Sequence, residues 1–361
     1  MRISFPHLGD YHAPLSLIAK RIFPHASLIL PPPITVKTIE LGAKYSPDFV
    51  CMPFKYNLGN FIEALELGAD TLMCAGAGCR YGFYGELHEL ILRDLGYKFD
   101  FVNFFDSNKS VVGLYGKCRN MGSNLSLPKF LLTAKLVVSA LRLMDTTDAY
   151  IREHQCLEQY NGTLSSLRND FLVRLPEVEN NRQLWLLSRQ YRKALRDVRL
   201  RQNVRPIRIG IVGELFSLME HTSSHFIESE LIRLGFLVTR HINLSYLLFH
   251  KKRNQNRLLK DNPDYIKYHL GADATETVIR ATHFAMDNYD AIIHLKPFGC
   301  TPELNAIPFL TKISSDYRIP ILYFSFDTQT SKTGITTRLE AFADMLHAKR
   351  QAKDITASAA I

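Results

Sequence analysis

The sequence lacks the segments that carry a chain into or across a membrane. No run of apolar residues approaches the roughly 18 that a membrane-spanning helix needs. The first residues show no apolar stretch followed by a small-residue cleavage site, which is the pattern of a secretory signal. We therefore expect a cytoplasmic protein with no membrane partner.

Zinc motifs are scarce as well. Zinc sites usually place two ligands as a Cys-x-x-Cys or a His-x₃-His pair, and no Cys-x-x-Cys is present. His221 and His225 form a His-x₃-His pair, but no cysteine lies near them in the sequence. We interpret this pair as part of a polar loop where a helix starts. A zinc-containing hydrolase is one hypothesis for the function, and the two others are given at the end of this subsection.

The composition predicts an ordinary globular protein of two domains. The chain has 361 residues, of which 46% are hydrophobic and 22% charged, so two domains of typical size can each bury a core. We place an N-terminal α/β domain at residues 1–125, a helical insert or linker at 126–204 and a C-terminal α/β domain at 205–361. No short-period repeat or low-complexity segment is present.

Positive charge is concentrated in two blocks. The net charge is +9, and much of it lies between Arg189 and Arg208 and between Lys251 and Lys260. Such stretches are more often the solvated face of a helix than a binding site, although they could attract an acidic partner protein or a CoA phosphate. No zinc-finger, RNP or helix-turn-helix pattern accompanies them, so we expect no nucleic-acid partner.

Short apolar runs alternate with amphipathic segments in both halves of the chain. This rhythm predicts the α/β class, with two Rossmann-like domains of mostly parallel strands covered by helices on both faces. Strands are expected at Arg2–His7, Ser27–Leu30, Asp48–Met52, Asp70–Cys74, Phe99–Phe104, Pro206–Val212, Phe236–His241, Ala291–Leu295 and Ile319–Phe326. Between the two halves, long helices are expected at Leu127–Met144, Thr147–Tyr160 and Asn181–Arg199.

Three cysteines share a position relative to these strands. Cys51 ends one expected strand, Cys79 follows another in a Gly-rich loop, and Cys300 follows the strand Ala291–Leu295. In doubly wound sheets, the carboxyl ends of the strands form the edge where ligands bind. Two of these cysteines come from one domain and one from the other, so a cleft between facing domains could bring all three together.

The loops around these cysteines suit a metal cluster. Gly76, Gly78 and Gly299 would let the backbone approach closely and turn its amides toward sulfur. Helices starting after Cys79 and Cys300 would favour the thiolate over the thiol. Iron–sulfur clusters ordinarily use four cysteines, so three would leave one iron open to a substrate, water or another ligand. Packing alone can explain any single buried cysteine, but it explains three matching positions less well.

Other polar residues near these loops are candidates for supporting roles. We assign Lys55, Arg80, Tyr84 and Glu303 as candidate catalytic residues, and Lys296 joins the three glycines as a candidate cofactor-binding residue. A cation would offset the negative charge of a cluster and raise its potential, and a carboxylate could act as an acid or a base. Each of these side chains could equally face water.

The remaining cysteines and one charged pair are interpreted differently. Cys118 lies in a polar loop and Cys156 in a helical stretch, so we take both as structural or incidental. Cys74, at the end of its strand, could point either way and could serve as a spare ligand. Asp327 and Arg338 flank the last loop, where they could form an ion pair or contact a phosphate.

Several motifs resemble one known family. They are Cys51–Asp70, Cys79–Glu86, Ile209–Glu214, Pro297–Glu303 and Thr337–Phe342. Together they resemble the activase-related proteins (CoA protein activase-like) of the 2-hydroxyacyl-CoA dehydratase superfamily, and the match runs along nearly the whole chain. The resemblance implies two flavodoxin-like domains, with a 4Fe–4S type cluster held between them by Cys51, Cys79 and Cys300.

The resemblance also implies a partner and a class of chemistry. A separate ATP-hydrolysing activator would deliver a low-potential electron, which in the dehydratase and benzoyl-CoA reductase relatives enters an acyl-CoA thioester. Other relatives hold a double-cubane cluster and reduce small molecules. This chain has no Gly-x₄-Gly-Lys-Ser/Thr loop, so ATP chemistry would belong to the partner. A dimer is a possible assembly.

The leading hypothesis is therefore a cluster-bearing electron-transfer or reductase component, dehydratase-like and sensitive to oxygen. The alternative is an interaction or assembly protein that keeps the fold without a working cluster and binds its partner through the basic helical insert. The presence of iron in protein purified without oxygen separates the two.

Overall fold

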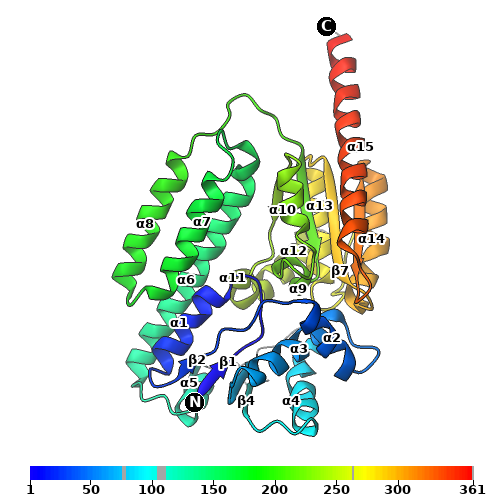
Figure 1. Cartoon of the computed structure of the whole chain (residues 1–361). Coiled ribbons are helices and arrows are strands. Elements are labelled where there is room, and N and C mark those ends of the chain that lie inside the picture. Colours follow the sequence, from blue (N-terminus) through cyan, green and yellow to red (C-terminus); the bar gives the residue numbers. More distant parts are fainter. Residues whose placement is uncertain (75–78, 104–110, 262–263, 360–361) are drawn as a thin grey trace. The chain divides into compact units, whose positions relative to one another are not determined.

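The computed structural model describes residues 1–74, 79–103, 111–261 and 264–359. The chain divides into two compact units (Figure 1). The N-terminal unit comprises Met1–Asp148 and Ser165–Val198, and the C-terminal unit comprises Ala149–Leu164 and Arg199–Ile361. Each unit contains one four-stranded sheet in which all strands are parallel. The α/β class with a long helical region between two sheets is thus confirmed.

The sheet of the N-terminal unit has the order β2-β1-β3-β4. Its strands are β1 (Arg2–Ser4), β2 (Ser27–Leu28), β3 (Thr71–Cys74) and β4 (Asp100–Asn103). The chain leaves β1 toward β2 and returns past β1 to β3, so the direction of the connections reverses between β1 and β3. Ligand sites of open α/β sheets lie at the carboxyl ends of the strands beside such a reversal.

Helices cover both faces of this sheet. Ile3 and Met73 pack with α1 (His12–Ile22), α5 (Val111–Asn120) and the start of α6 (Leu127–His154). Leu72 packs on the other face with α3 (Met52–Glu66) and α4 (Tyr84–Asp94), which follows the short 3₁₀ turn η1 (Arg80–Phe83). The fixed alternation of side chains along a strand sends neighbouring residues 72 and 73 to opposite cores.

Helix α2 (Val36–Tyr45) crosses α3 at a point where no side chain fits between the two backbones. A Cβ atom on Gly59 would lie 2.0 Å from the carbonyl oxygen of Thr38, and one on Gly42 would lie 1.9 Å from that of Lys55. Glycine at both positions therefore allows the close contact that fixes the start of α3.

The helical region is longer and more continuous than the sequence indicates. Helix α6 runs unbroken across the break that we expected between Met144 and Thr147, and it is followed by α7 (Thr163–Arg174) and α8 (Asn181–Asp197). Phe171 of α7 and Tyr191 of α8 are buried with their rings 5.2 Å apart. Thr146 and Thr147 lie inside α6, where the Thr146 hydroxyl bonds back to the carbonyl of Arg142 at 2.9 Å.

The sheet of the C-terminal unit repeats the same order, as β6-β5-β7-β8. Its strands are β5 (Arg208–Gly213), β6 (Leu237–Arg240), β7 (Ala291–Pro297) and β8 (Ile321–Phe326). The reversal of connections lies between β5 and β7. The loops that follow these two strands therefore border the expected ligand edge of this unit.

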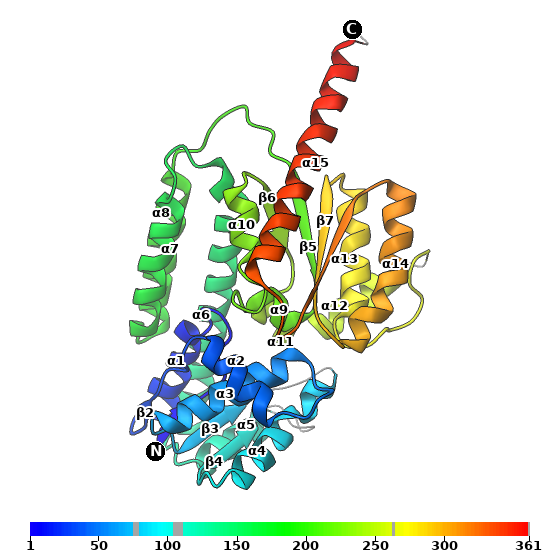
Figure 2. The ribbon, with the colours of Figure 1, turned by 45° about the vertical axis from the view of Figure 1, so that its right-hand side comes forward.

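Figure 2 shows the helices on the two faces of this sheet. One face packs against α10 (Ile227–Arg233) and α15 (Lys332–Ala359), and the other packs against α13 (Ala274–Met286) and α14 (Thr301–Tyr317). Three further helices, which were not predicted from the sequence, are α9 (Leu215–Met219), α11 (Leu244–Phe249) and α12 (Lys251–Asp261). No described helix is both long and apolar enough to cross a membrane.

The expected strand Asp48–Met52 is wrong. Residues 48–51 form a turn and loop, Phe49 is 93% exposed, and α3 begins at Met52. The short apolar run from Phe49 to Met52 resembles a strand in sequence. However, Pro53 favours the first turn of a helix, where its missing N–H costs nothing. Cys51 therefore precedes a helix without following a strand.

Candidate functional site

Cys51 and Cys300 occupy equivalent positions in the two units. Each is the N-cap residue of a helix, α3 or α14, and each is followed two residues later by a proline, Pro53 or Pro302. Neither sulfur caps its own helix. The partial positive charge at a helix N-terminus stabilises a thiolate. Both sulfurs thus lie where an anionic ligand is favoured.

Tyr84 contacts one of the expected ligands, Cys51, in the N-terminal unit. Its hydroxyl lies 3.1 Å from the Sγ atom of Cys51. Burial raises the pKa of Tyr84 far above its usual value, and the sulfurs of Cys51 and Cys79 raise it further. The phenol therefore stays protonated and can donate a hydrogen bond to the Cys51 sulfur.

Aromatic rings hold Tyr84 in place. Phe54 meets the Tyr84 ring edge-on at 4.8 Å and stacks on His88 at 4.1 Å. The Nε2 atom of His88 lies 3.0 Å from the carbonyl oxygen of Phe54, and burial lowers the pKa of His88 to about 4. His88 is thus a neutral, structural ring. Its role was not predicted from the sequence, although its spacing of four from Tyr84 places both on one face of α4.

The structure says less about the remaining candidate site residues of the N-terminal unit. Lys55 is partly buried in the first turn of α3, one turn after Cys51. Cys79 is exposed and immediately precedes η1. Gly76, Gly78 and the side chain of Arg80 lie outside the described residues.

Lys296 and Cys300 lie together at the carboxyl end of β7. Lys296 is only 6% exposed, and its ammonium donates to the Ser325 hydroxyl of β8 at 3.0 Å. Burial lowers the pKa of Lys296, while the nearby Cys300 and Glu303 oppose that effect. Gly299 has φ +75, a backbone conformation that few side chains tolerate. The candidates 296, 299 and 300 thus share one turn at the ligand edge.

Glu303 is not directed toward solvent, as an accessible acid or base would be. It is 1% exposed, its carboxylate lies 2.7 Å from Nε2 of the buried His294, and it accepts a hydrogen bond from Thr277 at 3.2 Å. This contact links β7, α13 and α14 beneath the turn that carries Cys300. Glu303 therefore connects that turn to the buried core of the C-terminal unit.

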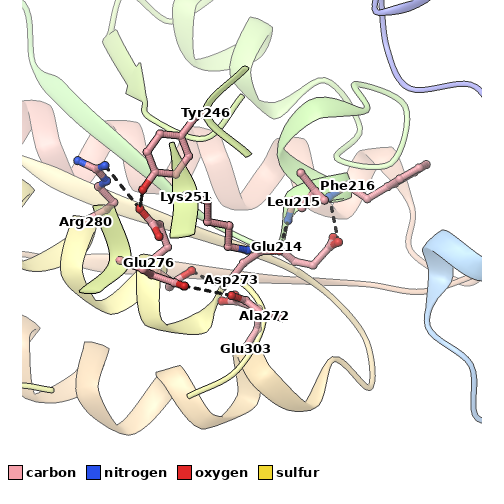
Figure 3. Close-up of polar contacts among 12 residues, drawn as sticks. Glu214, Leu215, Phe216, Tyr246, Lys251, Ala272, Asp273, Glu276, Arg280 and Glu303 are labelled. Carbon is pink, nitrogen blue, oxygen red and sulfur yellow. Dashed lines mark hydrogen bonds and ion pairs between the residues drawn. The ribbon is translucent and has the colours of Figure 1, made fainter. Parts of the chain in front are cut away.

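A second polar cluster, shown in Figure 3, lies where β5 ends. The carboxylate of Glu214 accepts the backbone N–H groups of Phe216 and Ser217, both at 2.9 Å. Asp273 accepts the N–H of Leu215 at 3.2 Å and forms an ion pair with Lys251. Burial, aided by the nearby Asp273, raises the pKa of Glu214 to about 7. The carboxyl of Glu214 therefore changes protonation near neutral pH.

The same cluster continues along α13. Tyr246 donates to Glu276, and Arg280 forms an ion pair with the same carboxylate at 3.5 Å (Figure 3). Glu276 is fully buried, and burial raises its pKa. No part of this cluster was predicted from the sequence. The one signal that the sequence held was Glu214, which directly follows Gly213 at the end of an apolar strand.

The six cysteines fall into two groups. The three expected ligands, Cys51, Cys79 and Cys300, are partly or fully exposed. Cys74, Cys118 and Cys156 are buried, and burial raises the pKa of Cys118 to about 11 and also raises that of Cys156. Among the described residues, no group of three or more His, Cys, Asp or Glu could hold a metal ion. A three-cysteine site would have to combine residues of both units.

No protein-family model matches this sequence, and no curated protein matches it.

Proposed function

We propose that this chain binds an iron–sulfur cluster through Cys51, Cys79 and Cys300 and acts as an electron-transfer or reductase component. The observation that carries the proposal is the division of the cysteines. The three accessible thiols are the three that the sequence motifs single out as expected ligands, and the three others are buried. Cysteines kept only for packing would not divide in this way.

The surroundings of these thiols fit an anionic cluster. Cys51 and Cys300 begin helices that carry partial positive charge at their N-termini. Tyr84 can donate a hydrogen bond to the Cys51 sulfur, and the ammonium of Lys296 lies near Cys300. Such donors and cations stabilise thiolate ligands and help to set the potential of a cluster. A bound 4Fe–4S cluster would supply one-electron chemistry.

The electron source and acceptor follow from the resemblance of the motifs. An ATP-hydrolysing activator would supply low-potential electrons, and an acyl-CoA or another small molecule would receive them. The partly buried turn of Lys296 and Cys300 at the end of β7 lies at the edge where such sheets bind ligands. The proposed enzyme class is thus a 2-hydroxyacyl-CoA dehydratase-like or ATP-dependent reductase component.

The test is the content of iron and acid-labile sulfide in the full chain purified and reconstituted without oxygen. About four irons and four sulfides per chain are expected for one 4Fe–4S cluster, and about eight irons would indicate a double cubane. Serine at residue 51, 79 or 300 should abolish the cluster. Cys118→Ser is the matched control and should retain it.

Thiol labelling tests the site without the cluster. In the folded, iron-free chain, iodoacetamide should modify the three accessible cysteines first and the three buried ones only after unfolding. Reconstitution with iron and sulfide should then protect residues 51, 79 and 300. A folded chain that takes up no iron under these conditions contradicts the proposal and favours the interaction protein.

A further inference from the structure

A pocket in the N-terminal unit has no role in the proposed cluster chemistry. It opens between α6 and α8 and has a volume of about 670 Å³, within the usual range for small-molecule sites. Four arginines line it, namely Arg142 of α6 and Arg189, Arg192 and Arg196 of α8. The spacing of three and four along α8 places the last three on one stripe of that helix.

The α8 arginines of this pocket have no acidic neighbour to neutralise them. No Asp or Glu is among the lining residues. No ion pair joins Arg189, Arg192 or Arg196 to any residue that the structure describes. Guanidinium groups bind phosphate oxygens in pairs of parallel hydrogen bonds. The arginines thus provide a site for a ligand with more than one negative charge.

The rest of the lining is apolar and aromatic. Leu143 and Leu184 are 5% exposed each and lie at the base of the pocket. Trp185 is 58% exposed at its edge, and the guanidinium of Arg189 lies 5.7 Å from the centre of the indole. An exposed indole beside arginine offers a flat surface on which a planar ring can stack. Inorganic phosphate would use the arginines but would leave this surface empty.

We propose that this pocket binds a nucleoside diphosphate. Its base stacks on Trp185, its sugar lies over the leucines, and its phosphates bind the arginines of α8. The hydroxyls of Ser139 and Ser188 also line the pocket and can bond the sugar or the phosphates. No cysteine lines this pocket, and it would bind the ligand without the Gly-rich loop that ATP-hydrolysing proteins use.

The sole tryptophan of the chain, Trp185, reports on this pocket directly. Titration of the full chain with ADP at low salt should quench its fluorescence in a saturable way. Adenosine and pyrophosphate should each bind at least about tenfold more weakly, because each lacks half of the contacts. An Arg192→Ala/Arg196→Ala variant should weaken ADP binding by about tenfold or more, with an unchanged circular dichroism spectrum.

Lys193→Ala is the matched control, since this exposed cation of α8 does not line the pocket. It should leave ADP affinity within about twofold. Trp185→Phe, followed by calorimetry, should weaken ADP more than pyrophosphate.

Three results would overturn the proposal. Pyrophosphate binding as tightly as ADP would reveal a simple anion site. Equal losses in the lysine and arginine variants would reveal non-specific attraction. Tight binding of a Glu-rich amphipathic helical peptide that ADP does not displace would identify a groove for an acidic protein.

Discussion

The hydroxyl of Tyr84 lies 3.1 Å from the sulfur of Cys51, across the first turns of α3 and α4. Phe54 and His88 enclose the phenol ring, so its hydroxyl has little freedom to turn away. Since burial keeps the phenol protonated, Tyr84 is a fixed donor to one proposed ligand. Tyr84 is therefore a positioning residue, which holds the Cys51 sulfur by a hydrogen bond and does not itself react.

Tyr84→Phe should therefore keep the cluster but lower its midpoint potential. A hydrogen bond to a ligand sulfur stabilises the reduced, more negative state of the cluster. If the bond contributes about 1 kcal/mol, its removal should lower the midpoint potential on the order of 40 mV for a one-electron couple. The measurement is a redox titration followed by electron paramagnetic resonance. Tyr115→Phe, which removes a hydroxyl bonded to the Leu125 carbonyl, should leave the potential unchanged. An unchanged potential in the Tyr84 variant would show that this contact does not reach the cluster.

The alternation of strands and helices could be predicted because it depends on local periodicity. Eight of the nine expected strands coincide with or overlap the strands that the structure describes. The error at Asp48–Met52 arose because an apolar run of four residues fits a strand as well as a loop before a helix. Only the exposure of Phe49 and the absence of a pairing strand among the described residues separate the two.

The candidate site could be predicted only in part. Cysteines beside Gly and Pro were visible in the sequence, and the structure shows these three to be accessible. That they bind a cluster stays a prediction. The burial of Glu303 against His294 was not visible, because it depends on how α14 packs on β7. The cluster of Glu214, Asp273 and Lys251 joins residues up to 59 positions apart (273 − 214). Sequence spacing gives no sign of such a contact.

Gly59→Ala should destabilise the N-terminal unit. The new Cβ would lie 2.0 Å from the Thr38 carbonyl oxygen, and both backbones belong to helices that cannot move independently. Overpacking of this kind costs about 1–3 kcal/mol or more. Unfolding in urea, followed by the fluorescence of Trp185, measures the free energy of unfolding of the N-terminal unit, to which Trp185 belongs.

Gly116→Ala in α5 is the control, because no atom lies within 4 Å of its added Cβ, and alanine favours a helix by about 1 kcal/mol. Equal effects of the two variants would contradict the close crossing.

Glu228→Gln should destabilise the C-terminal unit at neutral pH and do so less in acid. The carboxylate lies between Arg152 at 2.9 Å and Arg240 at 3.2 Å, and all three are largely buried. Burial alone would raise the pKa of Glu228, but the two guanidiniums outweigh it and lower the pKa to about 2. The stabilisation is thus present above the ordinary value of 4.5 and is lost as the pH falls toward 2.

At pH 7 the loss should be about 3–5 kcal/mol, since two buried cations lose their partner. Hydrogen exchange of the β6 amides measures this locally. Glu230→Gln removes a partner of the exposed Arg233 at 2.7 Å, and it should cost about 1 kcal/mol or less. A difference between Glu228→Gln and the wild type that stays constant from pH 7 to pH 3 would exclude the ion pairs as its cause.

Glu214 should have the opposite dependence on pH. Its pKa is raised to about 7 from an ordinary 4.5, so between these values the folded chain binds a proton that the unfolded chain does not. Stability from this group is therefore greatest in mild acid and is lost as the pH rises through 7. Glu214→Gln removes the titration while keeping an oxygen that can accept the N–H of Phe216 or Ser217.

The Glu214→Gln variant should become more stable relative to the wild type as the pH rises, so that its free energy of unfolding increases by about 2 kcal/mol relative to that of the wild type between pH 5 and pH 8. Exchange of the β5 amides at several pH values measures this difference. Glu340→Gln, at an exposed position of α15, should show no such trend. A difference between the variant and the wild type that stays constant between pH 5 and pH 8 would mean that Glu214 is ionised throughout. Lys251, and not a bound proton, would then compensate both carboxylates at the end of β5.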